Sequence, residues 1–209
     1  MTRSALVLAF SLAFTGAVHA AEQARTVPAF TSVNVQGPFN VIVEAGKAQS
    51  VAVRGSDKFV KEVVSEVVDG ELRMHMRDKN NSTLHGDQHI VVTVPALRAF
   101  SAEGAGEIRL NNIRGERFEV NYRGAGAMRI AGEVKAFKIS AQGVGEVDAK
   151  DLIANDVDIR FQGVGDARVY AKNRLDAKVQ GIGSLTYFGR PKVVNKSASG
   201  LGEVRQGDR

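Results

Sequence analysis

The residues best suited to metal chemistry are histidines in the first half of the chain. His85 and His89 stand four residues apart with Asp87 between them, and His75 precedes them. Imidazole and carboxylate groups are common ligands of zinc and other transition metals. His85, Asp87 and His89 are therefore candidate ligands, but the Asn, Ser and Gly residues of 80–86 predict a loop rather than a helix that would hold both histidines on one face. We expect neither a bound metal nor a cofactor.

A second set of candidate ligands is acidic. Glu107, Glu146 and Asp166 recur at equivalent positions of a repeat, so that their oxygens can converge on calcium if the repeats stack. Arginines recur two residues further along, at Arg109 and Arg168 among others, and compete for the same oxygens. Adjacent columns of opposite charge favour ion-paired ladders over a cation site.

The sequence contains no arrangement that is expected of a hydrolase. Glycoside cleavage needs two carboxyl groups that face each other, and such groups usually lie on long loops. The even spacing of the repeat leaves no room for such loops, and no serine stands in a nucleophile elbow. We predict no catalytic residues and a protein that is not an enzyme. A glycan-processing enzyme is the alternative, and a deep groove with two convergent carboxylates would support it.

The repeat itself is a Gly-apolar-Gly motif that occurs six times, at intervals of 20, 19, 20, 18 and 19 residues. Apolar residues alternate beside each copy, as with Phe137, Ile139 and Ala141, which places them on one face of a strand. A period this short, with no helical spacing, predicts short strands that stack from copy to copy. The structural repeat residues are Gly104, Gly106, Gly124, Gly126, Gly143, Gly145, Gly163, Gly165, Gly181, Gly183, Gly200 and Gly202.

The repeat predicts an all-β fold, specifically a parallel β-helix or β-solenoid with about 19–20 residues per coil. Glycine suits the bends because it adopts backbone angles closed to other residues. We expect the apolar residue between the two glycines, such as Val144 or Val164, to point into the core. The side chains of Gln142, Gln162 and Gln180 should hydrogen-bond from coil to coil.

Residues 30–97 are less regular and are expected to form an N-terminal β-rich segment that supplies the first coils or a cap. Residues 57–69 place apolar side chains at helical spacing, with Asp57 as N-cap and Gly70 as the stop, so one short helix is expected there, although the valines of this segment also suit a strand. Residues 98–209 carry the repeat. Residues 30–205 are expected to form one continuous domain.

The first 20 residues predict a secretory signal peptide, followed by a linker over 21–29. Arg3 precedes an apolar run that ends near Ala17, and a small-x-small cleavage site follows at Ala20. The run is too short for a membrane span. We therefore predict an exported protein, in the periplasm, at the cell surface or outside the cell, with no membrane span in the mature chain. The chain has no cysteine, so no disulfide is expected.

The formal net charge of +5 and the pI of about 9.6 would suit an anionic partner. Basic and acidic residues are interleaved, however, so we expect a mixed solvated surface and no nucleic-acid partner. Tyr122, Arg123, Arg129 and Arg168 are the candidate contact surface for an unidentified ligand, with a cell-envelope glycan or protein as the expected partner. Self-association through the edge of the C-terminal coil is a further expectation, which would make the chain a structural or self-assembling envelope protein.

The segments Phe30–Val35, Asn40–Val41, Glu71–Arg73 and Val94–Pro95, together with the glycine columns, resemble the bacterial family named putative auto-transporter adhesin, head GIN domain. The resemblance extends over residues 30–204. It implies a β-helical fold and an exported location. The function of that family is unknown, so the resemblance implies no catalytic residues. We expect a non-enzymatic, adhesin-like binding module whose ligand the sequence does not identify.

Overall fold

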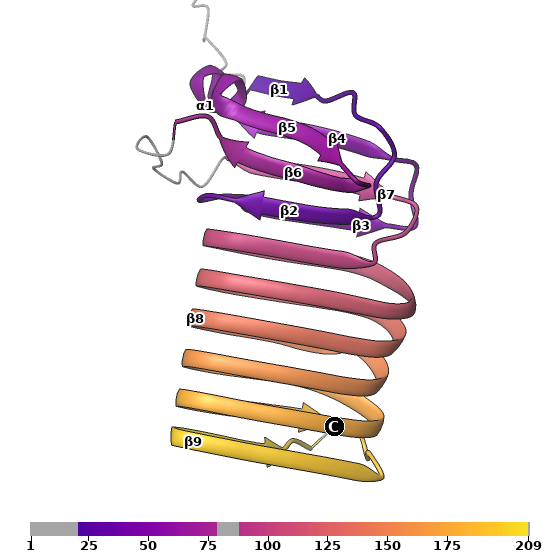
Figure 1. Ribbon diagram of the computed structural model, residues 1–209, viewed down its shortest axis with the longest axis vertical. Helices are drawn as coiled ribbons and strands as arrows, with labels where there is room; N and C mark the ends of the chain where they lie inside the picture. The colour runs from indigo at the N-terminus through magenta and orange to yellow at the C-terminus, as the bar shows by residue number, and fades with distance from the viewer. Residues whose placement is uncertain (1–20, 79–87, 209) are drawn as a thin grey trace, which may run out of the picture.

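The structure is a computed structural model that describes residues 21–78 and 88–208. The predicted signal peptide, His85 and Asp87 lie outside the described residues. The described elements are one mixed sheet and a helix (Figure 1), with the strands in the spatial order β1-β4-β7-β3-β8-β2-β6-β5 and β9 on β8. Their bounds are β1 Ala21–Ala24, β2 Ser32–Gln36, β3 Asn40–Ala45, β4 Ser50–Gly55, α1 Asp57–Glu62, β5 Val63–Val68, β6 Glu71–Met76, β7 His89–Val94, β8 Ala99–Phe188 and β9 Val193–Gln206.

The all-β class is confirmed, but the prediction of a regular parallel β-solenoid is wrong because the sheet is mixed. β2 pairs in parallel with β6 and β8, β3 pairs in parallel with β7 and β8, and β8 pairs in parallel with β9. The pairs β1–β4, β4–β7 and β5–β6 are antiparallel. One physical reason lies at Asp69 and Gly70, whose φ angles are 52° and 74°. Two successive positive φ angles form the tight turn that joins β5 and β6 as a hairpin.

Strand β8 runs through most of the glycine repeat and folds over itself in stretches that lie one above another (Figure 1). We call each stretch of about nineteen residues a rung. A Cβ added to Gly143 would lie against the carbonyl oxygen of Gly124, and one added to Gly163 would lie against that of Gly143. The same register continues into β9, where Gly200 pairs with Gly181. Residues one repeat apart are therefore neighbours, as the spacing predicted.

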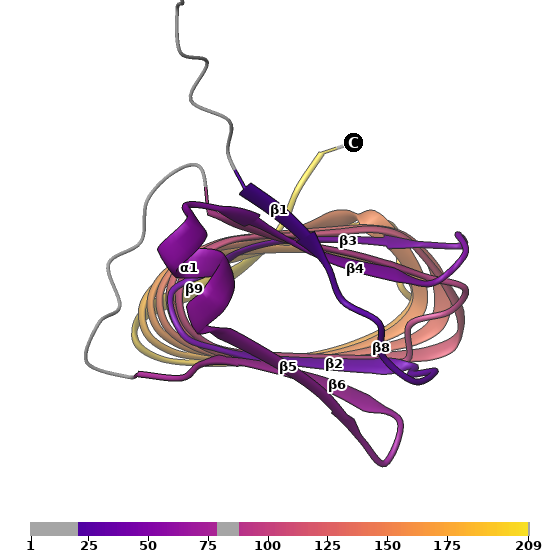
Figure 2. The ribbon, with the colours of Figure 1, turned by 90° about the horizontal axis from the view of Figure 1, so that it is seen from above.

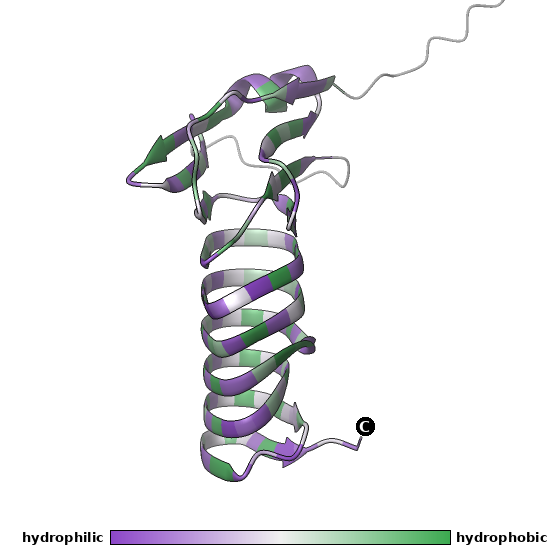
Figure 3. Ribbon diagram, turned by 90° about the vertical axis from the view of Figure 1, so that its right-hand side faces the viewer, coloured by the Kyte–Doolittle hydropathy of each residue, from purple (hydrophilic) through white to green (hydrophobic). Residues whose placement is uncertain are grey.

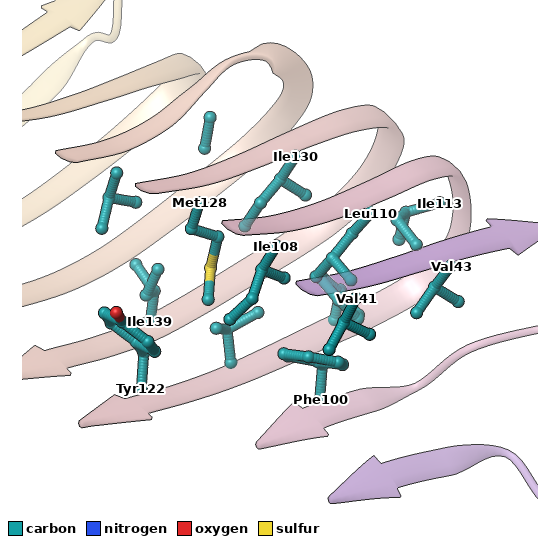
Figure 4. Close-up of a cluster of buried hydrophobic side chains, with 14 of the residues drawn as sticks. Val41, Val43, Phe100, Ile108, Leu110, Ile113, Tyr122, Met128, Ile130 and Ile139 are labelled. Atoms are coloured by element: carbon teal, nitrogen blue, oxygen red, sulfur yellow. The ribbon is translucent and has the colours of Figure 1, made fainter. Parts of the chain in front are cut away.

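The core lies between the two long sides of the rungs, which Figure 2 shows as the side of β2 and the side of β3. Inward side chains alternate with outward polar ones, so green and purple segments alternate along the ribbon in Figure 3. Figure 4 shows Phe100 and Tyr122 across the core from Ile108 and Met128. In one inward column the rings of Phe118 and Phe137 stack with their centroids 6.1 Å apart.

The N-terminal end of the stack is covered by β1, α1 and β5 (Figures 1 and 2). The helix ends at Glu62 and not at Asp69, because the β-branched residues that follow continue as β5. Its N-cap is Ser56, whose Oγ accepts a hydrogen bond from the Phe59 amide at 3.2 Å, and not Asp57. The ring of Phe59 packs against Phe39 at 5.9 Å and seals this end of the core.

Candidate functional site

The residue between the two glycines of each repeat points to solvent, so the prediction that it lies in the core is wrong. Val144 is 57% exposed and Val164 is 45% exposed. The reason is the strand period of two. Inward Ala141 and Val147 are separated by six residues, so the alternation passes without interruption through the glycines and leaves Val144 on the outside.

The glycines are required because, in their backbone conformation, a side chain would point at the preceding rung. Gly143 and Gly145 have φ angles of 133° and 141°, which L side chains rarely adopt. A Cβ on either would also lie 1.8 Å from a carbonyl oxygen of the preceding rung. The close contact of the two backbones keeps the outward residues in one straight column.

That column forms an apolar ridge along the bend, with one residue from each rung. Among the described residues, the exposed large hydrophobic side chains are Val193 and Val194 of β9 and four members of this ridge. Exposure reaches 54% at Ile182 and 80% at Leu201. Side-chain size increases steadily toward the C-terminal end. In chain order the apolar ridge comprises Ala105, Ala125, Val144, Val164, Ile182 and Leu201.

An acidic column lies on one side of the ridge, and three of its members, Glu107, Glu146 and Asp166, are bonded to neighbouring side chains. Glu107 pairs with Arg109 at 2.9 Å, and Glu146 pairs with Arg168. Asp166 accepts a hydrogen bond from Ser184 of the next rung at 2.5 Å. The interpretation of these acids as structural ladders and not calcium ligands agrees with these contacts.

Amide side chains lie on the other side of the ridge. Gln162 donates to Gln180 of the next rung at 2.5 Å, so the predicted bond between stacked amides is confirmed for this pair. Gln142 instead accepts from Arg123 Nε at 3.3 Å. The ridge is thus bordered largely by carboxylates on one side and largely by amides on the other.

A polar hollow of about 200 Å³ opens on the outer face of the long side that contains β2. Its side chains come from β2 and from successive rungs of β8, in register because Asn34 pairs with Ser101 and Gln36 with Glu103. Arg123 lies on the next rung, held by Gln142. Glu103 is the only carboxylate among the described residues that line it. The lining is Asn34, Gln36, Ser101, Ala102, Glu103, Asn121, Tyr122, Arg123, Ser140 and Gln142.

The four predicted contact residues do not form one surface. Tyr122 is only 7% exposed, and its hydroxyl has no hydrogen-bond partner. Burial therefore raises its pKa. Arg123 lines the polar hollow, whereas Arg129 lies past the glycine bend on the opposite long side. Arg168 also lies past that bend and pairs with Glu146.

The metal hypothesis gains no support from the described residues. Within 21–78 and 88–208, no three His, Cys, Asp or Glu side chains are placed to hold a metal ion. His75 lies on β6 and His89 begins β7. Because His85 and Asp87 lie outside the described residues, their part of the prediction is untested.

The last strand, β9, has exposed side chains on both faces except near Val204. Lys196 occupies an inward position, paired in register with Ala177 of β8. Its Nζ reaches the carbonyl oxygen of Val204 at 3.4 Å, across the open end of the last rung. A charge placed inward on an edge strand opposes pairing with a further strand. Self-association through this edge stays a prediction.

Sequence reasoning missed both the apolar ridge and the polar hollow, although the alternation contains a signal for each. Counting by two from inward Tyr122 places Ala125 outward and Asn121 and Arg123 on the outer face. Counting alternate residues does not show which outward columns lie beside β2. That pairing joins residues 67 positions apart, such as Asn34 and Ser101.

The family model described as "Putative auto-transporter adhesin, head GIN domain" matches residues 29–191. No curated protein matches the chain. Within the described residues, no helix has the length and apolar character that a bilayer span requires.

Two solved structures show the same fold. A putative adhesin from Bacteroides fragilis superposes with a TM-score of 0.74 at 22% identity, over 91% of this chain and 98% of the other. A putative adhesin from Parabacteroides merdae gives a TM-score of 0.53 at 14% identity, over 92% of this chain and 98% of the other. At these identities the likeness extends to the fold alone.

Proposed function

Since the chain belongs to the putative auto-transporter adhesin, head GIN domain family, we propose that it is an exported, non-enzymatic binding module that attaches to a cell-envelope glycan. The observation that carries the proposal is the polar hollow beside β2. Its lining combines amides, hydroxyls and the guanidinium of Arg123. Such groups supply both donors and acceptors, which is what the hydroxyls of a sugar ring require.

The size and the lining of the hollow favour recognition over catalysis. Drug-sized pockets enclose roughly 300–1,000 Å³, and at about 200 Å³ this hollow suits a single sugar unit of a longer chain. Glycoside hydrolysis needs a pair of carboxyl groups, whereas Glu103 is the one carboxylate among the described lining residues. The hollow can therefore hold a sugar but lacks the second acid that cleavage needs.

A glycan-binding assay on the purified protein tests this function, with an array of cell-envelope glycans and titration of any that is retained. Arg123→Ala should raise the dissociation constant about tenfold or more, since a hydrogen bond to a charged group contributes roughly 1.5–3 kcal/mol. Arg160→Ala is the matched control, because Arg160 is an exposed arginine of the same face outside the hollow.

Equal effects of the two substitutions would contradict the assignment of the hollow. Retention of no glycan by the wild-type protein would contradict the ligand class and leave a protein partner as the explanation of the surface. Release of a shortened glycan would contradict the non-enzymatic role.

A further inference from the structure

We propose that the apolar ridge is a self-association surface, on which two copies of the chain pair side by side and parallel, with each ridge residue against its own counterpart. This inference concerns the bend of the rungs and goes beyond the glycan function proposed for the long side. Folding has left four large aliphatic side chains in water, in one column, one per rung. Contiguous exposed apolar residues of this kind mark interaction surfaces more often than isolated ones do.

The exposed residues define the contact level by level. Val144, Val164, Ile182 and Leu201 are 57%, 45%, 54% and 80% exposed. Each lies between two glycines, so no neighbouring side chain of its own rung shields it. A twofold axis that runs along the ridge would bring each residue onto the same residue of a second copy, as an isologous contact requires.

The columns that border the ridge select this partner and this orientation. With the axis along the ridge, the column on one side of a molecule faces the column on the other side of its partner. At the level of Val144, Glu146 then faces Gln142 of the second copy, and at the level of Val164, Asp166 faces Gln162. At the level of Leu201, Glu203 faces Ser199. In each case a carboxylate that accepts hydrogen bonds meets a side chain that donates them.

An antiparallel arrangement, or an anionic lipid surface, fits these columns less well. With the axis across the ridge, the acidic column of one copy would face the acidic column of the other, and like charges in contact repel. The same acids, at Glu107, Glu146, Asp166 and Glu203, stand nearer to the ridge than the arginines two residues further along, so a negatively charged membrane seated on the ridge would meet the acids first. At the level of Ala105 the ridge side chain is small, and Glu103 would face Glu107 of the second copy. The two copies therefore touch at the levels from Val144 to Leu201.

The size of the ridge sets the expected strength. Its four large side chains would remove roughly 400 Å² per copy from water, about half of the roughly 800 Å² that each partner buries in a stable complex. We therefore expect a dimer that forms at about 10 µM to 1 mM, a range in which weak transient contacts lie. Such a dimer forms only where the local concentration of the protein is high.

Sedimentation across this concentration range, on the purified protein, tests the association. Ile182→Glu should raise the dissociation constant at least tenfold, because two carboxylates would then face each other on the axis. Val193→Glu is the control: Val193 is also exposed, at 47%, but lies off the ridge. A wild-type protein that stays monomeric at 1 mM, or a dimer that Ile182→Glu leaves intact, would overturn the proposal.

Single cysteines test the geometry, since the chain has no cysteine of its own. Ile182→Cys should form an intermolecular disulfide at least tenfold faster than Asn173→Cys, an exposed position nine residues earlier at the opposite bend. Equal rates would contradict the ridge as the interface. Faster crosslinking in a mixture of Val164→Cys and Ile182→Cys than in Ile182→Cys alone would contradict the parallel orientation. Circular dichroism of each variant establishes that the surface substitutions leave the fold intact.

Discussion

Replacing Gly143 by alanine should destabilise the protein far more than replacing Gly115, although both residues have positive φ angles, 133° and 150°. The new Cβ at Gly143 would lie 1.8 Å from the carbonyl oxygen of Gly124, whereas the one at Gly115 would meet nothing within 4 Å. The pair therefore separates the conformational cost, which both substitutions share, from the steric cost of rung stacking.

The magnitudes follow from those two costs. Left-handed backbone costs a residue other than glycine about 1–2 kcal/mol, so Gly115→Ala should lower the free energy of unfolding by about that amount. Since real Cβ contacts are essentially never shorter than 3.0 Å, Gly143→Ala must also move two rungs apart by more than 1 Å. The loss of about two ladder hydrogen bonds adds roughly 2 kcal/mol, for a total of about 4 kcal/mol.

Urea denaturation followed by far-ultraviolet circular dichroism measures both values. With a slope of about 2 kcal/mol per molar urea, Gly143→Ala should lower the midpoint by roughly 2 M and Gly115→Ala by less than about 1 M. A broadened transition for Gly143→Ala alone would indicate that the rungs on either side of the substitution unfold separately, which stacked repeats allow. Midpoints of the two variants that agree within about 0.3 M would refute the steric role of the glycine column.

Three further predictions concern buried or terminal groups. Tyr122→Phe should leave stability at pH 7 unchanged or raise it by about 1 kcal/mol, because the hydroxyl is buried without a partner; urea denaturation measures this, and a loss above 1 kcal/mol would contradict it. Because burial raises the pKa of Tyr122 above its ordinary value of 10.0, the wild type should lose stability as the pH rises above 10 and Tyr122→Phe should lose less, which a thermal melt series across pH 8–11 would check. Hydrogen bonds from Asn195 and then Arg174 hold the pKa of Asp176 below its ordinary value of 3.8, so the stabilisation is complete above pH 3.8 and is lost as the pH falls toward the lowered pKa. The protection of the β9 amides from exchange, relative to their intrinsic rates at each pH, should fall there in the wild type but not in Asp176→Asn. Lys196→Val removes the charge at the open end of the last rung, so sedimentation should show new association that persists in the presence of Ile182→Glu; an unchanged monomer would contradict the role of Lys196.

The register of the repeat was predictable because hardly any residue other than glycine fits a bend at which each rung lies against the preceding one. The glycine pairs therefore mark equivalent positions in successive rungs. The series from Gly104 to Gly202 places equivalent residues over one another without any knowledge of the fold. The direction of the residue between the glycines was predictable too, by counting in twos from Phe137 through Val147. The prediction was wrong because a bend was expected to interrupt the alternation of inward and outward side chains. At Gly143 and Gly145 the alternation continues.

The mixed sheet at the N-terminal end was only partly open to prediction. Asp69-Gly70 between alternating residues is a strong hairpin signal, and it explains why Val63–Val68 become a strand that turns back and not the end of a helix. The antiparallel pairing of β4 with β7 joins residues about 40 positions apart, such as Val51 and Val92. No local pattern specifies a partner at that distance, since the valines of either strand suit several neighbours.

The polar hollow illustrates the same limit at the level of function. Its donors and acceptors stand at outward positions that any solvated strand would fill with polar residues. Only the pairing of β2 with the first rung of β8 brings Asn34 beside Ser101, and only the next rung adds Arg123. A site assembled from single residues of successive rungs has no contiguous motif to detect.

The placement of β2 and β3 gives the molecule a built-in assembly order. These two strands lie between partners that are all synthesised later, with β6 and β7 on one side and the start of β8 on the other. Once residues up to Val94 are synthesised, β6 and β7 can pair with one edge of β2 and β3. The opposite edge is then available to pair with the start of β8 as that segment is synthesised. The N-terminal strands thus act as a folding nucleus. We expect the fold to tolerate truncation of rungs at the C-terminal end of the stack, but not removal of the N-terminal strands.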